Sequence, residues 1–239
     1  MCLLSTGSGV RVRVPAPYKK ELKIMKLLTE ETGVIDMRNT MYPSMSEKVK
    51  DSVKVTTRYA STYGFVLNGT AHLPNGWVAT DQQYFSYATD KEEEIRVKGT
   101  AVFFTRLGHM HQNNLGGPIE QSGRLCYIDG CSDSLLIYPS RAGDPSVNLL
   151  YFPPGINQTY HIHPSIRLGL VASGYGKSCL ADKEIDLVPG SIFCIEEREY
   201  HRFTTGDSEM RVIAYHPDGD WGPTDQNHTM LNRTYILDK

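Results

Sequence analysis

The chain has 239 residues, of which 40% are hydrophobic and 22% are charged, so it can form one large domain or two small ones with buried cores. Its net charge of −2 argues against the basic surface that binds nucleic acid or anionic membranes. No apolar run approaches the roughly 20 residues of a transmembrane helix. We therefore expect neither a nucleic-acid nor a membrane partner.

The cysteines give an expectation about the cellular compartment. The sequence contains five of them, an odd number, and none is part of a CxxC pair. This usage is typical of a reduced, intracellular chain, so we predict a cytoplasmic protein.

The N-terminal part of the chain divides at Met25. Residues 1–24 have a composition foreign to the rest, and we predict that they are a non-native or disordered leader, with Met25 as the biological start. Residues 25–50 show no single secondary-structure pattern, and we predict one short helix near Ser46–Lys50.

From Val53 onward, short β-rich runs alternate with Gly, Pro, Asn and Asp. No long segment with a helical period of 3.6 residues competes with this pattern. The pattern predicts an all-β protein with fewer than a fifth of its residues in helices. The clearest expected strands are Tyr63–Leu67, Gln83–Tyr87, Ala101–Thr105, Leu149–Phe152, Arg167–Ala172, Ser191–Ile195 and Arg211–Tyr215.

A weak internal repeat indicates two tandem barrels. The run Tyr63–Gly69 parallels Leu168–Gly174, and Val97–Phe103 parallels Val188–Cys194. The first copy carries extra residues that would form a hairpin around Pro74-Asn75-Gly76. The expected domains are an N-terminal barrel over 25–110, a linker with bridging strands over 111–147, and a C-terminal barrel with a loop extension over 148–239.

The second copy contains a histidine pair with the period of a strand. His161 and His163 project from the same face of an extended chain, while Ile162 points to the other face. Across a small barrel, His201 on a later β-run would supply a third imidazole. Three neutral imidazoles suit divalent Fe, Zn, Ni, Cu or Mn and leave positions open for other ligands. The alternative is a pair of hydrogen-bonded surface histidines on an edge strand.

These residues resemble the two sequence motifs of the cupin family. The first motif is a Gly, five residues and His-x-His, here Gly155 with His161 and His163, and it closes on a second Gly, here Gly174. The second motif begins at Gly190 and reaches its histidine at His201. The resemblance implies tandem double-stranded β-helix (jelly-roll) barrels, and a divalent metal held by His161, His163 and His201, with Fe(II) favoured and Zn, Ni or Mn as alternatives.

Arg167 departs from the family pattern, because it stands where cupins usually carry an acidic metal ligand. Some cupins with three histidines and no acidic ligand are iron dioxygenases, and an arginine beside the metal would attract a carboxylate, phosphonate or enolate. We therefore predict a catalytic role for Arg167 in fixing a small anionic substrate. The alternative is an Arg167 that turns outward to a salt bridge.

The first copy is predicted to be degenerate and metal-free. Thr56 and Arg58 stand in place of its two histidines, and Met110 stands opposite His201 in the repeat. These side chains do not form a competent metal site. His109 and His111 flank Met110, and we interpret them as a loop feature. This barrel is expected to have a structural role, which includes a homodimer contact.

Three further residues near the second site are weaker candidates for a substrate pocket: Tyr160, Tyr175 and Arg202. The function favoured by the whole pattern is a three-histidine, non-heme Fe(II) dioxygenase acting on a small anionic substrate. A metal-dependent sugar-acid isomerase or epimerase, with Glu196 or Glu197 as the base, is the first alternative. A non-catalytic ligand-binding cupin is the second.

Overall fold

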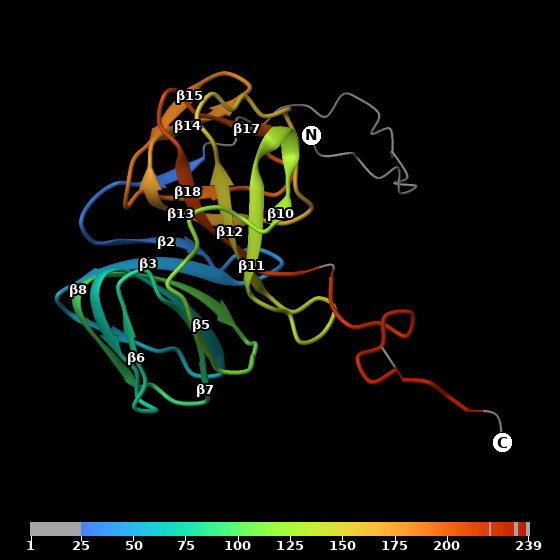
Figure 1. Cartoon of the computed structure of the whole chain (residues 1–239). Helices are drawn as coiled ribbons and strands as arrows, with labels where there is room; N and C mark the ends of the chain where they lie inside the picture. The colour runs from blue at the N-terminus through green and yellow to red at the C-terminus, as the bar shows by residue number, and fades with distance from the viewer. Residues whose placement is uncertain (1–24, 220, 232–233, 238–239) are drawn as a thin grey trace.

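The computed structural model in Figure 1 describes residues 25–219, 221–231 and 234–237. The helical part of these residues is a single 3-10 turn, η1 (Ile128–Gly130), which confirms the predicted all-β class. No helix in the described ranges is long and apolar enough to cross a bilayer. The predicted leader, residues 1–24, lies outside the described residues.

The N-terminal half is built around an eight-stranded antiparallel sheet, in which β4 and β6 pair with longer neighbours at the side of the main path. Its strands are β2 (Gly33–Met37), β3 (Ser44–Lys50), β4 (Val53–Val55), β5 (Ala60–His72), β6 (Val78–Thr80), β7 (Tyr84–Thr89), β8 (Glu94–Leu107) and β9 (Asn114–Gly116).

The C-terminal half combines a seven-stranded and a three-stranded sheet. The larger sheet has the order β1-β16-β13-β18-β12-β11-β10, and the smaller has the order β15-β14-β17. The strands are β1 (Lys26–Leu28), β10 (Leu125–Cys126), β11 (Ser132–Ile137), β12 (Ser146–Phe152), β13 (Arg167–Gly174), β14 (Gly176–Leu180), β15 (Glu184–Leu187), β16 (Ile192–Ile195), β17 (His201–Thr204) and β18 (Met210–His216).

The helix predicted near Ser46–Lys50 is wrong, because this segment is strand β3. β3 pairs along its whole length with β8, and the whole of β2 pairs with its other edge. Ser44, Ser46 and Lys48 alternate with less buried residues, which is the period of two that a strand requires. Pairing with two neighbours outweighs the local preference of this polar segment.

The internal repeat is confirmed by strand pairing. In the first copy β5 pairs with β8, and in the second copy the corresponding strands β13 and β16 pair with each other. The expected hairpin around Pro74-Asn75-Gly76 is confirmed as well, since β5 and β6 pair on either side of it. The fold is thus two tandem cupin-like barrels, the first built on one sheet and the second on two.

The two halves share one hydrophobic core because the seven-stranded sheet is apolar on both faces. Along β18, Ile213 and Tyr215 point toward the N-terminal half, where Phe104 stacks on Tyr215 at a ring-centroid distance of 5.5 Å. Val212 points the other way, into the core of the C-terminal barrel with Phe203. Successive residues of a strand face opposite sides, so one sheet closes both cores.

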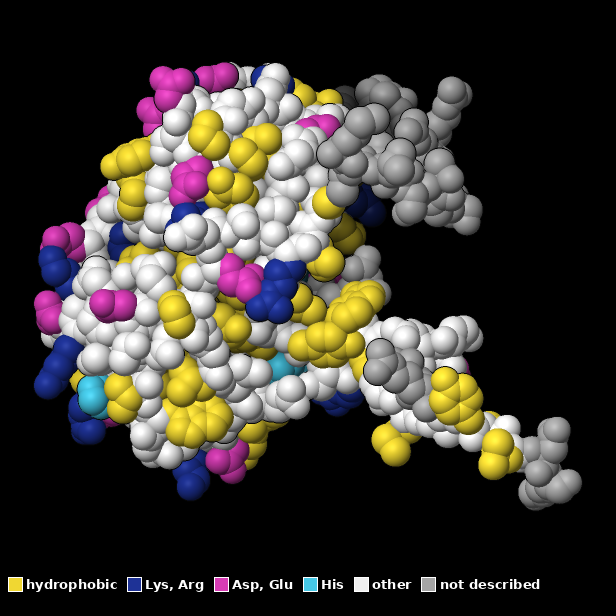
Figure 2. Space-filling view, in the orientation of Figure 1, with side chains coloured by type: hydrophobic (Ala, Val, Ile, Leu, Met, Phe, Trp, Pro, Cys, Tyr) yellow, Lys and Arg dark blue, Asp and Glu magenta, His cyan; other side chains and the backbone are white. Residues whose placement is uncertain are grey.

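The expected boundaries at 110 and 147 can be compared with the sheets. Strand β1 lies in the sheet of the C-terminal half, paired with β16, and β10 and β11 extend that same sheet. After β18, the chain first packs against the β11–β12 connection, where Gly219 bonds to Asp144 and Trp221 lies against Tyr138. The described residues further on run away from both barrels (Figure 1). Figure 2 shows hydrophobic side chains along this extension, where Met230 and Leu231 are exposed.

Candidate metal centre

His161 and His163 lie in an extended segment between β12 and β13. The sequence pattern predicted a regular strand for this segment, and it is not one. Isolated bridges instead join Asn157 to Thr204 and His161 to His201. Two backbone hydrogen bonds, of 2.9 and 3.1 Å, connect His161 and His201. They hold the histidine pair against the start of β17.

His201 is fully buried, with no exposed surface, and its ring is fixed by one hydrogen bond. Nδ1 lies 2.8 Å from the backbone carbonyl of Glu199. A carbonyl only accepts, so Nδ1 carries the proton and the lone pair is on Nε2. Nε2 is buried and has no hydrogen-bond partner among the described residues. A buried nitrogen with a lone pair and no partner fits a metal ligand.

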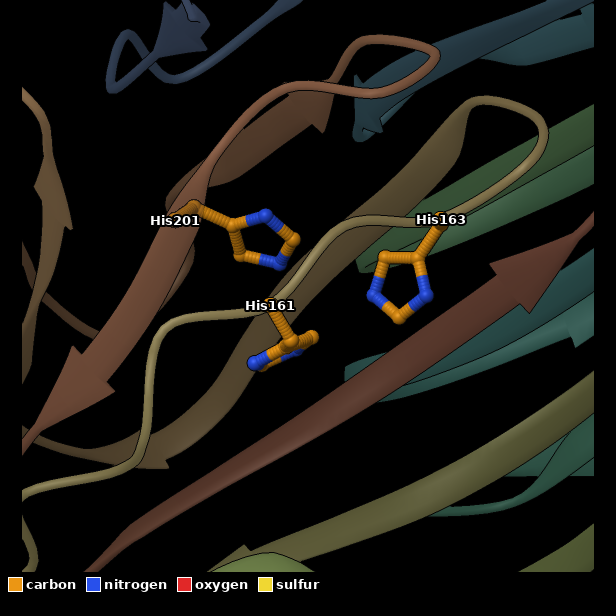
Figure 3. Close-up of side chains that lie close together, drawn as sticks. All are labelled: His161, His163 and His201. Atoms are coloured by element: carbon orange, nitrogen blue, oxygen red, sulfur yellow. The ribbon is translucent and has the colours of Figure 1, made fainter. Parts of the chain in front are cut away.

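The three histidines form one cluster, shown in Figure 3. Their rings face a common space, with His161 and His163 coming from the extended segment and His201 from β17. One ligand nitrogen from each residue lies within 4.8 Å of the other two, so the three nitrogens form one group beside a common space. The described residues include no other such group of three.

The protonation states of the cluster also suit a metal ion. Burial, more than the neighbouring charges, lowers the pKa of His163 to about 2 and that of His201 to about 4. The Nδ1 atom of His161 lies 3.0 Å from the carbonyl of Thr159, which orients the ring as Glu199 orients His201. Neutral imidazoles whose second nitrogen is held by a carbonyl are typical zinc and iron ligands. The residues therefore fit a divalent metal.

Arg167 begins β13, and its guanidinium is held close to its own backbone. Nη1 donates to the carbonyl of Ile166 at 2.9 Å and to Oγ of Ser165 at 2.5 Å. The same nitrogen lies 3.6 Å from Oδ1 of Asp218, to which the Ser165 hydroxyl also donates. The side chain nevertheless lines the cavity of the histidine cluster, and its charge contributes to the low pKa of His163. Arg167 thus forms an ion pair with Asp218 and also lies beside the histidine cluster.

The histidines open into a cavity of about 70 Å³ inside the C-terminal barrel. One wall is formed by His161, His163, His201, Gln158 and Phe203, and the opposite wall is one face of the seven-stranded sheet. Strand pairing places the side chains of that face in rows, because directly paired residues point to the same side. The row through Asn148, Ala214, Gly169 and Phe193 is one example.

Five polar residues of this cavity were missed by the sequence reasoning: Tyr127, Asp133, Asn148, Gln158 and His216. Asn148 and His216 alternate with core residues along β12 and β18. Because alternate residues of a strand share a face, their positions could have predicted that they point into the cavity. Burial, with a smaller effect from Arg167, lowers the pKa of His216 to about 3, so this imidazole is neutral. Asp133 and Tyr127 precede the predicted strands of the second barrel and carried no motif.

The weaker pocket candidates lie elsewhere and are not among the lining residues of this cavity. Tyr160 stacks on Tyr200 at 4.6 Å, and the guanidinium of Arg202 lies over the Tyr160 ring at 4.6 Å. Tyr175 is exposed at the turn between β13 and β14. Glu196 and Glu197 are also absent from the lining; they border a separate surface hollow beside Met37 and Ser165.

The residues singled out in the N-terminal half are engaged in other contacts or exposed. The Thr56 hydroxyl donates to the carbonyl of Lys91 and accepts from the amide of Glu93. Met110 is exposed. Both ring nitrogens of His111 lie near backbone carbonyls, those of Gln112 and Tyr138. The absence of metal from this half stays a prediction.

Comparison with known proteins assigns the part of the chain that holds the histidine cluster to a domain family. Residues 148–216 match the model of the cupin domain. No curated protein matches the chain. The fold is similar to a cupin 2 conserved barrel domain protein from Leptotrichia buccalis, with 12% identity, a TM-score of 0.56, and coverage of 82% of this chain and 97% of that one.

Two other structures share the fold over a similar extent. The putative glyoxylate induced protein from Pseudomonas aeruginosa is 14% identical, with a TM-score of 0.60 and coverage of 84% of this chain and 82% of that one. A variant of oxalate decarboxylase from Bacillus subtilis is 10% identical, with a TM-score of 0.50 and coverage of 83% and 76%. At these identities the similarity shows the fold. With the domain match and the motif histidines gathered in one barrel, residues 148–216 form a cupin domain within a chain that shares the fold of these structures.

Proposed function

We propose that this protein is a metal-dependent cupin enzyme, a three-histidine Fe(II) dioxygenase that acts on a small anionic substrate. The observation that carries the proposal is the cluster of His161, His163 and His201 at a buried cavity that Arg167 also lines. Such a reaction needs a cation to bind the substrate anion and a set of metal ligands, and here Arg167 and the three histidines lie beside one small cavity. Fe(II), when bound there, supplies the means to activate O₂.

The three imidazoles would hold the ion and leave part of its coordination sphere open. No carboxylate belongs to the cluster, so the bound ion keeps its full charge and attracts an anionic ligand. His161 and His201 would be held in position by the carbonyls of Thr159 and Glu199. Fixed ligands of this kind lower the cost of organising the site when metal and substrate bind.

Arg167 would orient the anionic group of the substrate. A guanidinium recognises a carboxylate through parallel N–H donors, which fixes direction as well as charge. Asp218 and Ser165 hold one side of the guanidinium, so its position is set before a ligand enters. The apolar side chains of Phe193, Phe203 and Val212, which line the same cavity, would keep bulk water away and strengthen these interactions.

A metal-dependent isomerase or epimerase of a sugar acid is the second candidate, because one carboxylate, Asp133, lines the cavity. The acidic residues first considered for this role, Glu196 and Glu197, border a different hollow. The mainly apolar lining favours the dioxygenase, since a sugar acid presents many hydroxyl groups that need polar partners. A ligand-binding protein without catalysis would bind the same anions and turn over none.

Oxygen consumption separates these candidates. The protein would be purified, its metal content measured by mass spectrometry, and Fe(II) restored under anaerobic conditions. A panel of small carboxylates and enolisable acids would then be tested with an oxygen electrode and by product analysis. Substrate-dependent oxygen uptake that disappears in His163→Ala supports the dioxygenase. Product formation that proceeds equally without oxygen supports the isomerase, and binding without any product supports the non-catalytic alternative.

A further inference from the structure

A groove of about 380 Å³ lies at the seam between the two halves, where β3 faces the C-terminal barrel (Figure 1). The N-terminal half contributes Lys48 and Lys50 of β3, and the C-terminal half contributes Pro189 and Gly190 from the turn between β15 and β16. None of the residues that line this groove also lines the cavity of the histidine cluster. The two hollows are therefore separate.

Lys48 reaches across the seam with its side chain buried. The residue is only 5% exposed, and its Nζ donates a hydrogen bond of 2.6 Å to the backbone carbonyl of Gly190. An ammonium group carries three N–H donors, so this bond leaves two of them for a ligand in the groove. A buried ammonium is unfavourable unless an opposite charge lies close to it.

The neighbouring lysines differ from Lys48, because each of them has a carboxylate partner. Lys54, which is 4% exposed, pairs with Glu47 at 2.6 Å, and Lys50 pairs with Glu31 at 2.6 Å. Lys48 forms no ion pair with any described residue. Burial lowers its pKa, and the more distant acidic groups oppose this effect only in part. The charge of Lys48 is thus left for an incoming anion to neutralise.

Strand pairing places further polar side chains beside this ammonium. Lys50 is directly paired with Thr100 of β8, and Thr100 with Asn68 of β5, so the three side chains form one row. Lys48 is two residues before Lys50 and shares its face. All four line the groove, whose charged lining residues are two lysines and one carboxylate, Glu31. The lining therefore has a net positive charge and offers neutral donors as well.

We propose that this groove binds a small oxyanion, the phosphate or carboxylate group of a metabolite, which Lys48 holds together with Lys50 and Thr100. The site is separate from the histidine cluster, so the inference does not rest on the proposed function. Its volume is within the range of pockets that take a whole small molecule. The N-terminal half, in which the metal motif is degenerate, would then supply the cations of a binding site.

Replacement of Lys48 tests the ammonium directly. Lys48→Met keeps an unbranched apolar side chain and removes the charge. A hydrogen bond to a charged group corresponds to about ten- to hundredfold in affinity, so we expect this variant to bind the anion at least tenfold more weakly. Lys91→Met, at an exposed lysine between β7 and β8, is the matched control and should keep the wild-type affinity.

Calorimetric titration with inorganic phosphate and with malonate measures the affinity at low ionic strength, where screening is weak. A metal ion at the histidine cluster would also attract these anions, so every titration is repeated in the His163→Ala background, with metal content determined. We expect binding that depends on Lys48 in both backgrounds. The anion that binds more tightly identifies the oxyanion that the groove prefers.

Three results would overturn the inference: no binding of either anion to the wild type, unchanged affinity in Lys48→Met, or binding that His163→Ala abolishes and Lys48→Met retains. In the last case the anion would lie at the histidine cluster. If Lys48→Met does not fold, Thr100→Val replaces it and should weaken binding at least threefold, because it removes a donor and keeps the shape of the side chain. Unchanged affinity in that variant contradicts the proposed site equally.

Discussion

His161 and His201 come from segments far apart in the sequence, yet their backbones exchange two hydrogen bonds, of 2.9 and 3.1 Å, and their ring centroids lie 4.5 Å apart. This backbone bridge places one imidazole from the extended segment beside one from β17. His163, two residues further along, then completes the cluster. The geometry of the site depends on this bridge as much as on the side chains.

Each of the three cluster histidines should be necessary for metal binding. We expect His161→Ala, His163→Ala and His201→Ala each to lower metal affinity at least tenfold, because two imidazoles hold a divalent ion weakly against water. Metal content after dialysis, measured by mass spectrometry, checks this. His109→Ala and His216→Ala should retain wild-type stoichiometry, and metal at wild-type levels in His201→Ala would show that the site lies elsewhere.

Arg167 should affect the substrate anion more than the metal. Arg167→Met keeps much of the apolar length of the side chain but removes the charge, so we expect retained metal and an affinity for small carboxylates that falls about tenfold or more. Calorimetric titration of the metal-loaded variant with lactate measures this. Unchanged affinity in this variant would mean that the guanidinium serves only its ion pair with Asp218.

The metal-free protein should lose stability as the pH falls below about 6.5. The folded-state pKa of His216, about 3, and that of His201, about 4, lie below the ordinary histidine value of 6.5. The unfolded chain therefore binds more protons, and each such group lowers the free energy of unfolding by roughly 1.4 kcal/mol per pH unit between its two pKa values.

Denaturant unfolding of the metal-free protein at pH 6, 5 and 4 measures this dependence. The stability contributed by these groups is present above pH 6.5 and is lost as the pH falls toward the folded-state pKa. His216→Asn should reduce the slope by about one proton relative to the wild type. An identical slope in this variant would show that the imidazole of His216 does not have a lowered pKa in the folded protein.

Gly174 should be intolerant of any side chain. It closes the first histidine motif and adopts a φ of +75°, and a Cβ at this position would collide with the backbone carbonyl of Glu209. We expect Gly174→Ala to destabilise the protein by about 2 kcal/mol or more, since left-handed backbone strain and a backbone clash act together. Gly206→Ala, where the added Cβ meets nothing within 4 Å, is the control and should change the melting temperature little.

The strands and the histidine motifs could be predicted from the sequence because both depend on local patterns. Short β-rich runs between turn residues predicted β18 and β13, and the spacing from Gly155 and Gly190 predicted which histidines would meet. The helix near Ser46–Lys50 was wrong for the opposite reason. Its polar residues carry little local preference, and the pairing of β3 with two neighbours decided its conformation.

By itself, the sequence determined the all-β class, the tandem repeat and the three histidines of the candidate metal centre. Only the tertiary structure decided which other side chains share their cavity. Asp133 faces it because β11 pairs with β12 in one register, and a shift of one residue would turn its carboxylate to the other side. Strand register arises from contacts between distant segments, so no single stretch of sequence contains it.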